Sequence, residues 1–493
     1  MVMRVGVGLA SGMELEKMVE KLISAERIPL DKMEQDRTKL EWKRDAFRKI
    51  NTKLSELDNL IRNEMKYSTT YNSKIVSSSL EDAVTATATT ATSNGTYQVR
   101  VDQLASSAIN VSKNPIDIDP TQPLTAGEVI AFSTVNKEGK EEKYTYTIQA
   151  GDTLNTVMEK ISKDDNNVRM FYDEASKKVI METTRTGNFN ENGSEIIFAD
   201  TSFLATTLKM DMANEKGGNN AKFEYNNSGI IMESKTNSYT INGINLQFKN
   251  TTNGKNASLT IDNDVEAAYE KIKNFVDKYN EVVEAFNSPQ FERIYRDYQP
   301  LTDKQKEEMS DKQIELWEER AKSGLLRGEP VITNGLYSLR QSWYQKVETG
   351  GEYTSLTQLG ISTSPNYLDG GKLIIEDPDK LKDALRDNPE EVRKLFYNRE
   401  EGESRGLINR LEDSVNRTMQ QIGDKAGKAT TLSLDSYTLG KQMKELDERI
   451  EAYENRIERV EKRYWAQFTA MEKAISQMNQ QSMMLLSQFG GGM

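Results

Sequence analysis

The chain has 493 residues, of which 36% are hydrophobic and 29% are charged, and its formal net charge at pH 7 is -12. It contains neither cysteine nor histidine, which excludes disulfides, thiolate chemistry, zinc held by these residues and histidine-based catalytic triads. The acidic balance, with no cluster of basic residues, argues against nucleic acid as the main partner. A chain of this length and polarity is typical of an elongated protein with several domains.

The first 13 residues are small and apolar but lack the basic start of a secretory signal peptide. We therefore expect that the general secretory route does not export this chain. The sequence has no run of about 18 apolar residues, so we expect no membrane insertion.

Two amphipathic helices, separated by a proline, are predicted near the N-terminus. The first covers residues 13–28, and Pro29 is expected to end it because the proline ring disfavours helical backbone at Ile28. The second covers about residues 30–65, where apolar side chains recur every seven residues, as in a coiled coil. The residues of this row are Met33, Leu40, Phe47, Leu54 and Ile61.

The middle of the chain favours strands and turns. Alternation at 84–89 and the run at 96–101, with Asn94-Gly95 between them, predict a pair of strands. Asn242-Gly243 predicts a further hairpin, since this dipeptide suits the tight turns that join two strands. After these strands, helix is expected to return at about residue 265, capped by the short polar side chains that precede it.

The last helix is predicted over residues 435–489 from a second heptad pattern. Spacings of three and four residues alternate, which keeps one seam in contact with a partner helix. At a rise of about 1.5 Å per residue, a helix of about 50 residues is about 75 Å long, which exceeds an ordinary globular core. The seam residues are Met443, Leu446, Ile450, Tyr453, Ile457, Val460 and Tyr464.

Towards the end of this helix the apolar row becomes rich in methionine, whose flexible side chain suits changing partners. An exposed apolar stripe needs another chain, or a chaperone until that chain arrives. We expect such partner-binding rows on both terminal helices. Their residues are Met13, Met18, Leu22, Leu30, Met471, Met478, Leu485 and Phe489.

Two segments resemble ligand-binding motifs only superficially. Residues 423–430 are one residue short of a phosphate-binding loop, and no buried strand precedes them, so we interpret them as a polar linker. Residues 262–264 begin like a calcium loop but lack its glycine and its closing glutamate. We therefore expect no enzyme activity, no catalytic residues, no metal and no cofactor.

The predicted fold class is α+β and multidomain, with long terminal helices that form a coiled-coil or helical-bundle stalk and a β-rich head inserted between them. Four domains are expected. They are residues 1–45 with 450–493 as terminal leg helices that stay flexible until assembled, 46–74 with 265–449 as a helical-bundle stalk, 75–115 with 225–264 as a β-rich head, and 116–224 as a second β-rich head.

Short motifs spread over the chain then point to one family. They are residues 8–13 (GLASGM), 27–30 (RIPL), 151–154 (GDTL), 239–243 (YTING), 273–280 (KNFVDKYN), 359–361 (LGI), 371–373 (GKL) and 463–464 (RY). In this order they resemble the hook-associated protein 2 family of flagellar filament-capping proteins, and 151–154 resembles the flagellin-type insertion motif of that family.

The resemblance implies a structural cap at the distal tip of a bacterial flagellar filament, which promotes and templates the insertion of exported flagellin. It implies export by the flagellar type III apparatus without a cleaved signal peptide, and a ring of commonly about five subunits. The implied partners are flagellin, the hook–filament junction proteins and an export chaperone at the C-terminal helix. The alternative is a stalked surface adhesin that binds surface glycans through residues 116–224.

Overall fold

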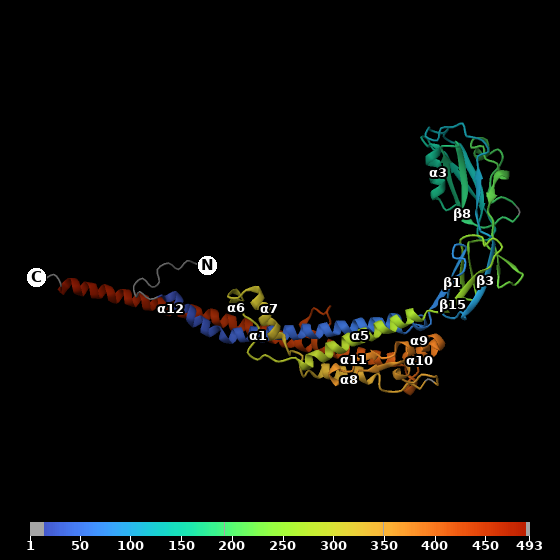
Figure 1. Cartoon of the computed structure of the whole chain (residues 1–493). Helices are drawn as coiled ribbons and strands as arrows, with labels where there is room; N and C mark the ends of the chain where they lie inside the picture. The colour runs from blue at the N-terminus through green and yellow to red at the C-terminus, as the bar shows by residue number, and fades with distance from the viewer. Residues whose placement is uncertain (1–13, 192, 349, 490–493) are drawn as a thin grey trace. The chain divides into compact units, whose positions relative to one another are not determined.

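The computed structural model of the chain describes residues 14–191, 193–348 and 350–489 (Figure 1). The chain forms two compact units. The first, here called the helical unit, joins Met1–Tyr71 with Tyr269–Met493, and the second, the β-rich unit, is Asn72–Ala268. The predicted α+β class, with long terminal helices on either side of a β-rich middle, is confirmed. The finer division into four domains stays a prediction.

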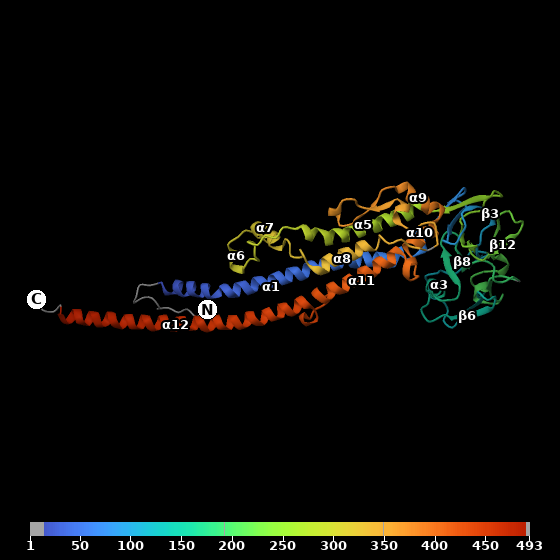
Figure 2. The ribbon, with the colours of Figure 1, turned by 90° about the horizontal axis from the view of Figure 1, so that it is seen from below.

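Five helices build most of the helical unit. They are α1 (Leu15–Leu60), α5 (Val265–Phe291), α8 (Pro330–Gln341), α11 (Leu407–Ala426) and α12 (Thr438–Phe489). Helix α1 packs against both α11 and α12, and α12 runs antiparallel to it (Figures 1 and 2). The apolar faces of these helices form the core, because each amphipathic helix must bury its apolar stripe against another element.

Shorter elements complete this unit. A π-helical turn, Ile61–Met65, continues α1, and Gly423 lies inside α11 and not in a linker, so the expected linker begins later than residue 423. The remaining elements are α2 (Ser68–Tyr71), α6 (Asp303–Glu307), α7 (Asp311–Lys322), α9 (Pro378–Asp387), α10 (Pro389–Phe396) and the antiparallel strands β16 (Ile361–Thr363) and β17 (Leu373–Ile375).

The predicted helix break at Pro29 is wrong, because α1 runs through this residue without interruption. Proline lacks the N–H that would bond to the carbonyl of Ala25, which costs a helix interior about 3 kcal/mol. Buried residues on both sides of Pro29, namely Leu15, Val19 and Leu30, fix the two halves of the helix. Their burial offsets the lost hydrogen bond, since tertiary packing and not propensity supplies most helix stability in proteins.

One core of the β-rich unit lies between a five-stranded and a three-stranded sheet. The first sheet has the order β1 (Lys74–Ser78), β15 (Ala257–Asn263), β3 (Gly95–Gln103), β11 (Ala221–Tyr225) and β12 (Ile231–Ser234). The second has the order β13 (Ser238–Ile241), β14 (Ile244–Phe248) and β2 (Val84–Ala88). Alternate residues of these strands, such as Val99, Phe223, Leu246 and Leu259, point into the shared core.

The predicted pairing of the strands at 84–89 and 96–101 is wrong. Strand β2 pairs with β14, whereas β3 pairs with β15 and β11 in the other sheet. The Asn242-Gly243 hairpin is confirmed, with φ of 50° and 77° at its two turn residues, as a type I′ turn requires. That hairpin presents β14 to β2, so a strand from a distant part of the chain takes the place of the sequence neighbour.

A second core in the same unit is built by residues between Ile116 and Met210. It contains α3 (Leu154–Lys163), which begins with a capping box at Thr153. The other elements are α4 (Phe203–Thr206), the four-stranded sheet β10 (Lys216–Gly217), β4 (Ser107–Val111), β8 (Lys178–Thr186), β7 (Val168–Asp173), and the three-stranded sheet β6 (Glu141–Thr147), β5 (Val129–Val135), β9 (Ile196–Ile197).

Replacing Pro29 by alanine should stabilise α1, because alanine restores the hydrogen bond to Ala25 at an exposed position. The gain should reach about 1–3 kcal/mol in local opening free energy. Hydrogen exchange followed by mass spectrometry is the measurement, and peptides that cover residues 24–34 should exchange more slowly. Lys21→Ala, an exposed change in the same helix, is the control; equal protection in both variants would contradict the account.

Candidate partner-binding surfaces

The predicted seam residues lie along the inner faces of α1 and α12. Six of them are buried and the other six are half-buried. The buried six are Phe47, Leu54, Ile61, Met443, Ile457 and Val460, and the half-buried six are Met33, Leu40, Leu446, Ile450, Tyr453 and Tyr464. The heptad rows therefore face the interior of the helical unit, and their further role as a seam in an assembly stays a prediction.

An ion pair between the two terminal helices was not predicted. The guanidinium of Arg37 donates from Nε to Asp447 Oδ1 at 2.8 Å and from Nη2 to Asp447 Oδ2 at 3.5 Å. The Asp447 carboxylate raises the pKa of Arg37, despite partial burial that acts in the other direction. Both residues hold the same heptad position, four after Met33 and four after Met443, where coiled coils place their ion pairs. This shared heptad position is the feature of the sequence from which the ion pair could have been predicted.

The predicted partner-binding residues of α1 do not share one face. Met18 and Leu22 are exposed, by 41% and 39%, whereas Leu30 is buried and only 1% exposed. Leu15 and Val19, which are not among the predicted partner-binding residues, are buried as well. Leu30 therefore contacts a partner only if its neighbouring helices open. Met13 lies outside the described residues.

On α12 the predicted row is half-buried at Met471 and exposed beyond it. Met471 is half-buried, Met478 is 65% exposed and Leu485 is 54% exposed. Helix α12 extends past Leu15, where α1 begins (Figures 1 and 2), and its exposed apolar surface there also includes Leu486. The side chain of Phe489 lies outside the described part of the chain. This end of α12 is the largest run of exposed apolar side chains on the described helices of the helical unit.

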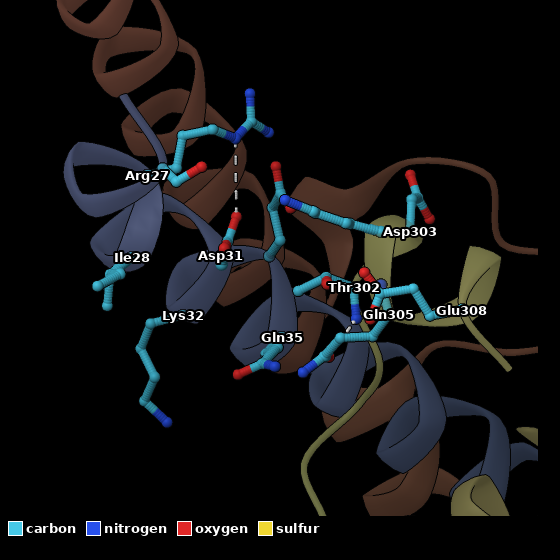
Figure 3. Close-up of a pocket in the computed structure, with 12 residues that line it drawn as sticks. Arg27, Ile28, Asp31, Lys32, Gln35, Thr302, Asp303, Gln305 and Glu308 are labelled. Carbon is cyan, nitrogen blue, oxygen red and sulfur yellow. Dashed lines mark hydrogen bonds and ion pairs between the residues drawn. The ribbon is translucent and has the colours of Figure 1, made fainter. Parts of the chain in front are cut away.

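A charged groove of about 660 Å³ lies between the N-terminal part of α1 and α6 (Figure 3). Arg27 and Asp31 form an ion pair on its wall, with 3.9 Å between Nε and Oδ1. Burial, followed by the nearby charge of Asp31, raises the pKa of Glu34 in the same groove. Within residues 14–191, 193–348 and 350–489 no group of three or more acidic side chains is arranged to hold a metal ion.

The charged segment of residues 292–322, which follows α5, packs on α1. The Trp317 indole donates to the Gln299 carbonyl at 2.7 Å, and its ring lies 4.6 Å from that of Tyr298. The Lys322 ammonium lies 4.6 Å from the centre of the Trp42 ring, a cation–π contact. The segment therefore covers part of α1 at Trp42.

Three helices of the helical unit meet at Glu329, the residue before α8. Its carboxylate binds the ammonium of Lys425 on α11 at 2.7 Å and forms a shorter contact with Lys43 on α1. Partial burial acts to raise the pKa of Glu329, but the two ammonium groups outweigh it and hold the pKa below its ordinary value of 4.5.

These features define a class of protein: one whose two long terminal helices pack against each other and whose last helix carries an exposed apolar surface towards its end. None of the helices within the described ranges is long and apolar enough to cross a membrane.

The comparisons with known proteins define the family. Residues 11–108 match the model of the flagellar hook-associated protein 2 N-terminus, and residues 218–480 match that of its C-terminus. The flagellar hook-associated protein 2 of Halalkalibacterium halodurans is 35% identical, over 97% of this chain and 98% of that protein. The chain belongs to the flagellar hook-associated protein 2 family, which confirms the resemblance seen in the sequence.

Two further proteins extend the comparison. The A-type flagellar hook-associated protein 2 of Pseudomonas aeruginosa is 26% identical, over 96% of this chain and 95% of that protein. The D1-D2-D3 domains of the flagellar cap protein FliD from Escherichia coli have a similar structure, with a TM-score of 0.57 at 18% identity, over 78% of this chain and 97% of that one. At this identity the likeness concerns the fold. The two family models leave out residues 109–217, which contain the second core of the β-rich unit.

Replacing Glu329 by glutamine should lower the unfolding free energy of the helical unit by about 1 kcal/mol at neutral pH, since it removes a largely shielded carboxylate from two ammonium groups. A depressed pKa stabilises the folded state at pH values above 4.5, and this stabilisation disappears as the pH falls below it. Urea unfolding at about pH 7 and about pH 3.5 should therefore show a difference from wild type that shrinks in acid. Glu315→Gln, at an exposed site, is the control; a difference independent of pH would contradict the account.

Proposed function

We propose that this chain is the cap at the distal tip of a bacterial flagellar filament, and that it promotes and templates the insertion of exported flagellin subunits. The observation that carries the proposal is the match to flagellar hook-associated protein 2 of Halalkalibacterium halodurans over nearly the whole of both chains. The similar fold of the Escherichia coli flagellar cap protein supports it. The function is structural and needs no catalytic residue or cofactor.

The terminal helices are the proposed contact with the filament. The exposed apolar row at the end of α12, with Met478 and Leu485, offers side chains that pack against a flagellin subunit and release it again. Such stepping requires interfaces of modest area, because the cap must give way each time a subunit enters. Met18 and Leu22 on α1 are exposed and provide a second, smaller contact.

The proposed partners follow from this role. The chain assembles with copies of itself into a ring, and it meets flagellin and the hook–filament junction proteins. An export chaperone covers the end of α12 before assembly, because an exposed apolar helix end aggregates without a partner. The proposed route out of the cell is the flagellar type III apparatus, without a cleaved signal peptide, and the proposed location is the filament tip. Residues 1–45 with 450–493 act as the leg, 46–74 with 265–449 as the stalk, and 75–115 with 225–264 and 116–224 as two head domains.

Deletion of the gene tests the cap function directly. Without a cap, exported flagellin should leave the cell as soluble monomer, and hooks should lack filaments under the electron microscope. Immunoblots of culture supernatant measure the monomer, and the gene supplied in trans should restore filaments. Normal filaments without released flagellin would reject the proposal.

The double change Met478→Asp with Leu485→Asp tests the leg contact. Each apolar side chain buried in a partner contributes about 1.5–3 kcal/mol, so the affinity for the filament should fall about 100-fold or more. A deletion strain that carries this variant should release flagellin into the medium, while circular dichroism of the purified protein stays unchanged. Gln477→Asp with Gln480→Asp adds the same charge to exposed positions of the same part of α12, away from the apolar row, and should keep the cap functional. Equal release by both variants would contradict the role of the apolar row.

A further inference from the structure

An apolar groove of about 590 Å³ lies between α1, α5 and the turn after α7. Its apolar lining consists of Ala46, Ile50, Ala285, Pro289, Leu325 and Leu326. Such a groove exceeds the size of one aliphatic side chain, and it leaves apolar surface of the helical unit in contact with water. It therefore offers a binding place for an apolar side chain from outside.

A loop between α11 and α12 carries one such side chain. Leu432 is 95% exposed, the highest value among the large hydrophobic residues of the described chain. The loop has a fixed shape: Arg48 Nε donates to the Ala426 carbonyl at 3.0 Å, and the Lys428 amide donates to Thr431 Oγ1 at 3.0 Å. Arg48 also lies over the ring of Tyr437, with 5.6 Å to its centre. A side chain presented on an ordered loop loses little entropy when it binds.

The groove and the loop lie at the same level on different sides of α1. A cleft lies beside the loop, between α1 and α11. Helix α1 lines the groove with Ala46, Ile50 and Lys53, and it lines the cleft with Arg48 and Ser55. At about 100° per residue, the full α1 linings of the groove and the cleft are centred about a third of a turn apart around the helix. Figure 2 shows α5 on one side of α1 and α11 on the other, with the loop projecting beyond α11. Thr52 is exposed and lines both the groove and the cleft.

The charges beside the two features are complementary. Lys49 is exposed at the groove, and its ammonium forms no ion pair with any described residue. Asp424 is exposed beside the loop, and its carboxylate likewise has no ion-pair partner in the described parts of the chain. A second copy that places its loop on the groove brings an acidic group to the basic one.

We propose that the occupant of the groove is a second copy of this chain, whose Leu432 inserts between α1 and α5 of its neighbour. Since one copy uses its loop and the next uses its groove, the contact is heterologous and repeats from copy to copy. Two complementary surfaces at one level on different sides of α1 let successive copies stand side by side without a shift along α1. The inference deepens the self-association part of the proposed function, and names the residues that carry it.

Disulfide trapping tests the contact, because the natural chain has no cysteine and gives no background. The purified full-length double variant Leu432→Cys with Ala285→Cys should form, on mild oxidation, a series of dimers, trimers and larger species on a non-reducing gel. A bridge within one chain would leave the product at the size of a monomer, so only bridges between copies give the series. Each single variant should give dimers at most. Leu432→Cys with Lys49→Cys repeats the test at an exposed position, so that a folding defect at Ala285 does not decide it.

Two controls separate this contact from others. Leu316→Cys with Ala285→Cys uses another exposed leucine and should give no series, whereas a series there would mean random collision and overturn the proposal. A series from Met478→Cys with Ala285→Cys, and none from Leu432→Cys with either partner, would assign the groove to the end of α12 and also overturn it. Light scattering should show Leu432→Asp associating about tenfold more weakly than Leu316→Asp. The test needs no flagellin, so a positive series with normal filaments in the deletion strain would reject the cap and keep this interface.

Discussion

The helical unit depends on one packing interaction, the antiparallel contact of α1 with α12. Arg37 and Asp447, which form an ion pair across it, are 410 residues apart in the chain. Closing so long a loop costs conformational entropy before any contact forms, although the cost rises only slowly with length. The full or partial burial of the two heptad rows offsets that cost, and α5, α8 and α11 then complete the unit around the two terminal helices.

One heptad pattern serves two purposes along α12. Where α1 and α11 lie beside it, residues such as Met443 and Ile457 are buried, and the pattern acts as a core. Beyond the start of α1 the same spacing continues through Met478 and Leu485, which are exposed. The spacing of apolar residues thus sets which face of α12 is apolar, whereas the length of the neighbouring helix sets where that face becomes exposed.

Much of the fold was predictable because its signals are local. The heptads, the cap at Thr153 and the Asn242-Gly243 hairpin each depend on residues within a few positions of one another. The errors concern contacts between distant segments: whether α1 continues at Pro29 depends on packing on both sides, and the partner of β2 is a strand that follows β2 by more than a hundred residues. For the same reason the sequence could not separate the exposed Met18 from the buried Leu30, because both side chains are apolar and lie on one helix.

The chain enters and leaves the β-rich unit at two adjacent points. Its first strand, β1, pairs with its last, β15, from Lys74 opposite Asn263 to Ser78 opposite Leu259. On the helical side, the Lys271 ammonium donates to the Thr69 carbonyl at 3.1 Å, so the two crossing segments are also adjacent there. An insertion closed in this way returns the chain to the helices next to the place where it left them, whatever the length of the segment between the two paired strands. The helical core and the β-rich unit are thereby built from different stretches of one polypeptide, with a single pair of adjacent crossings between them.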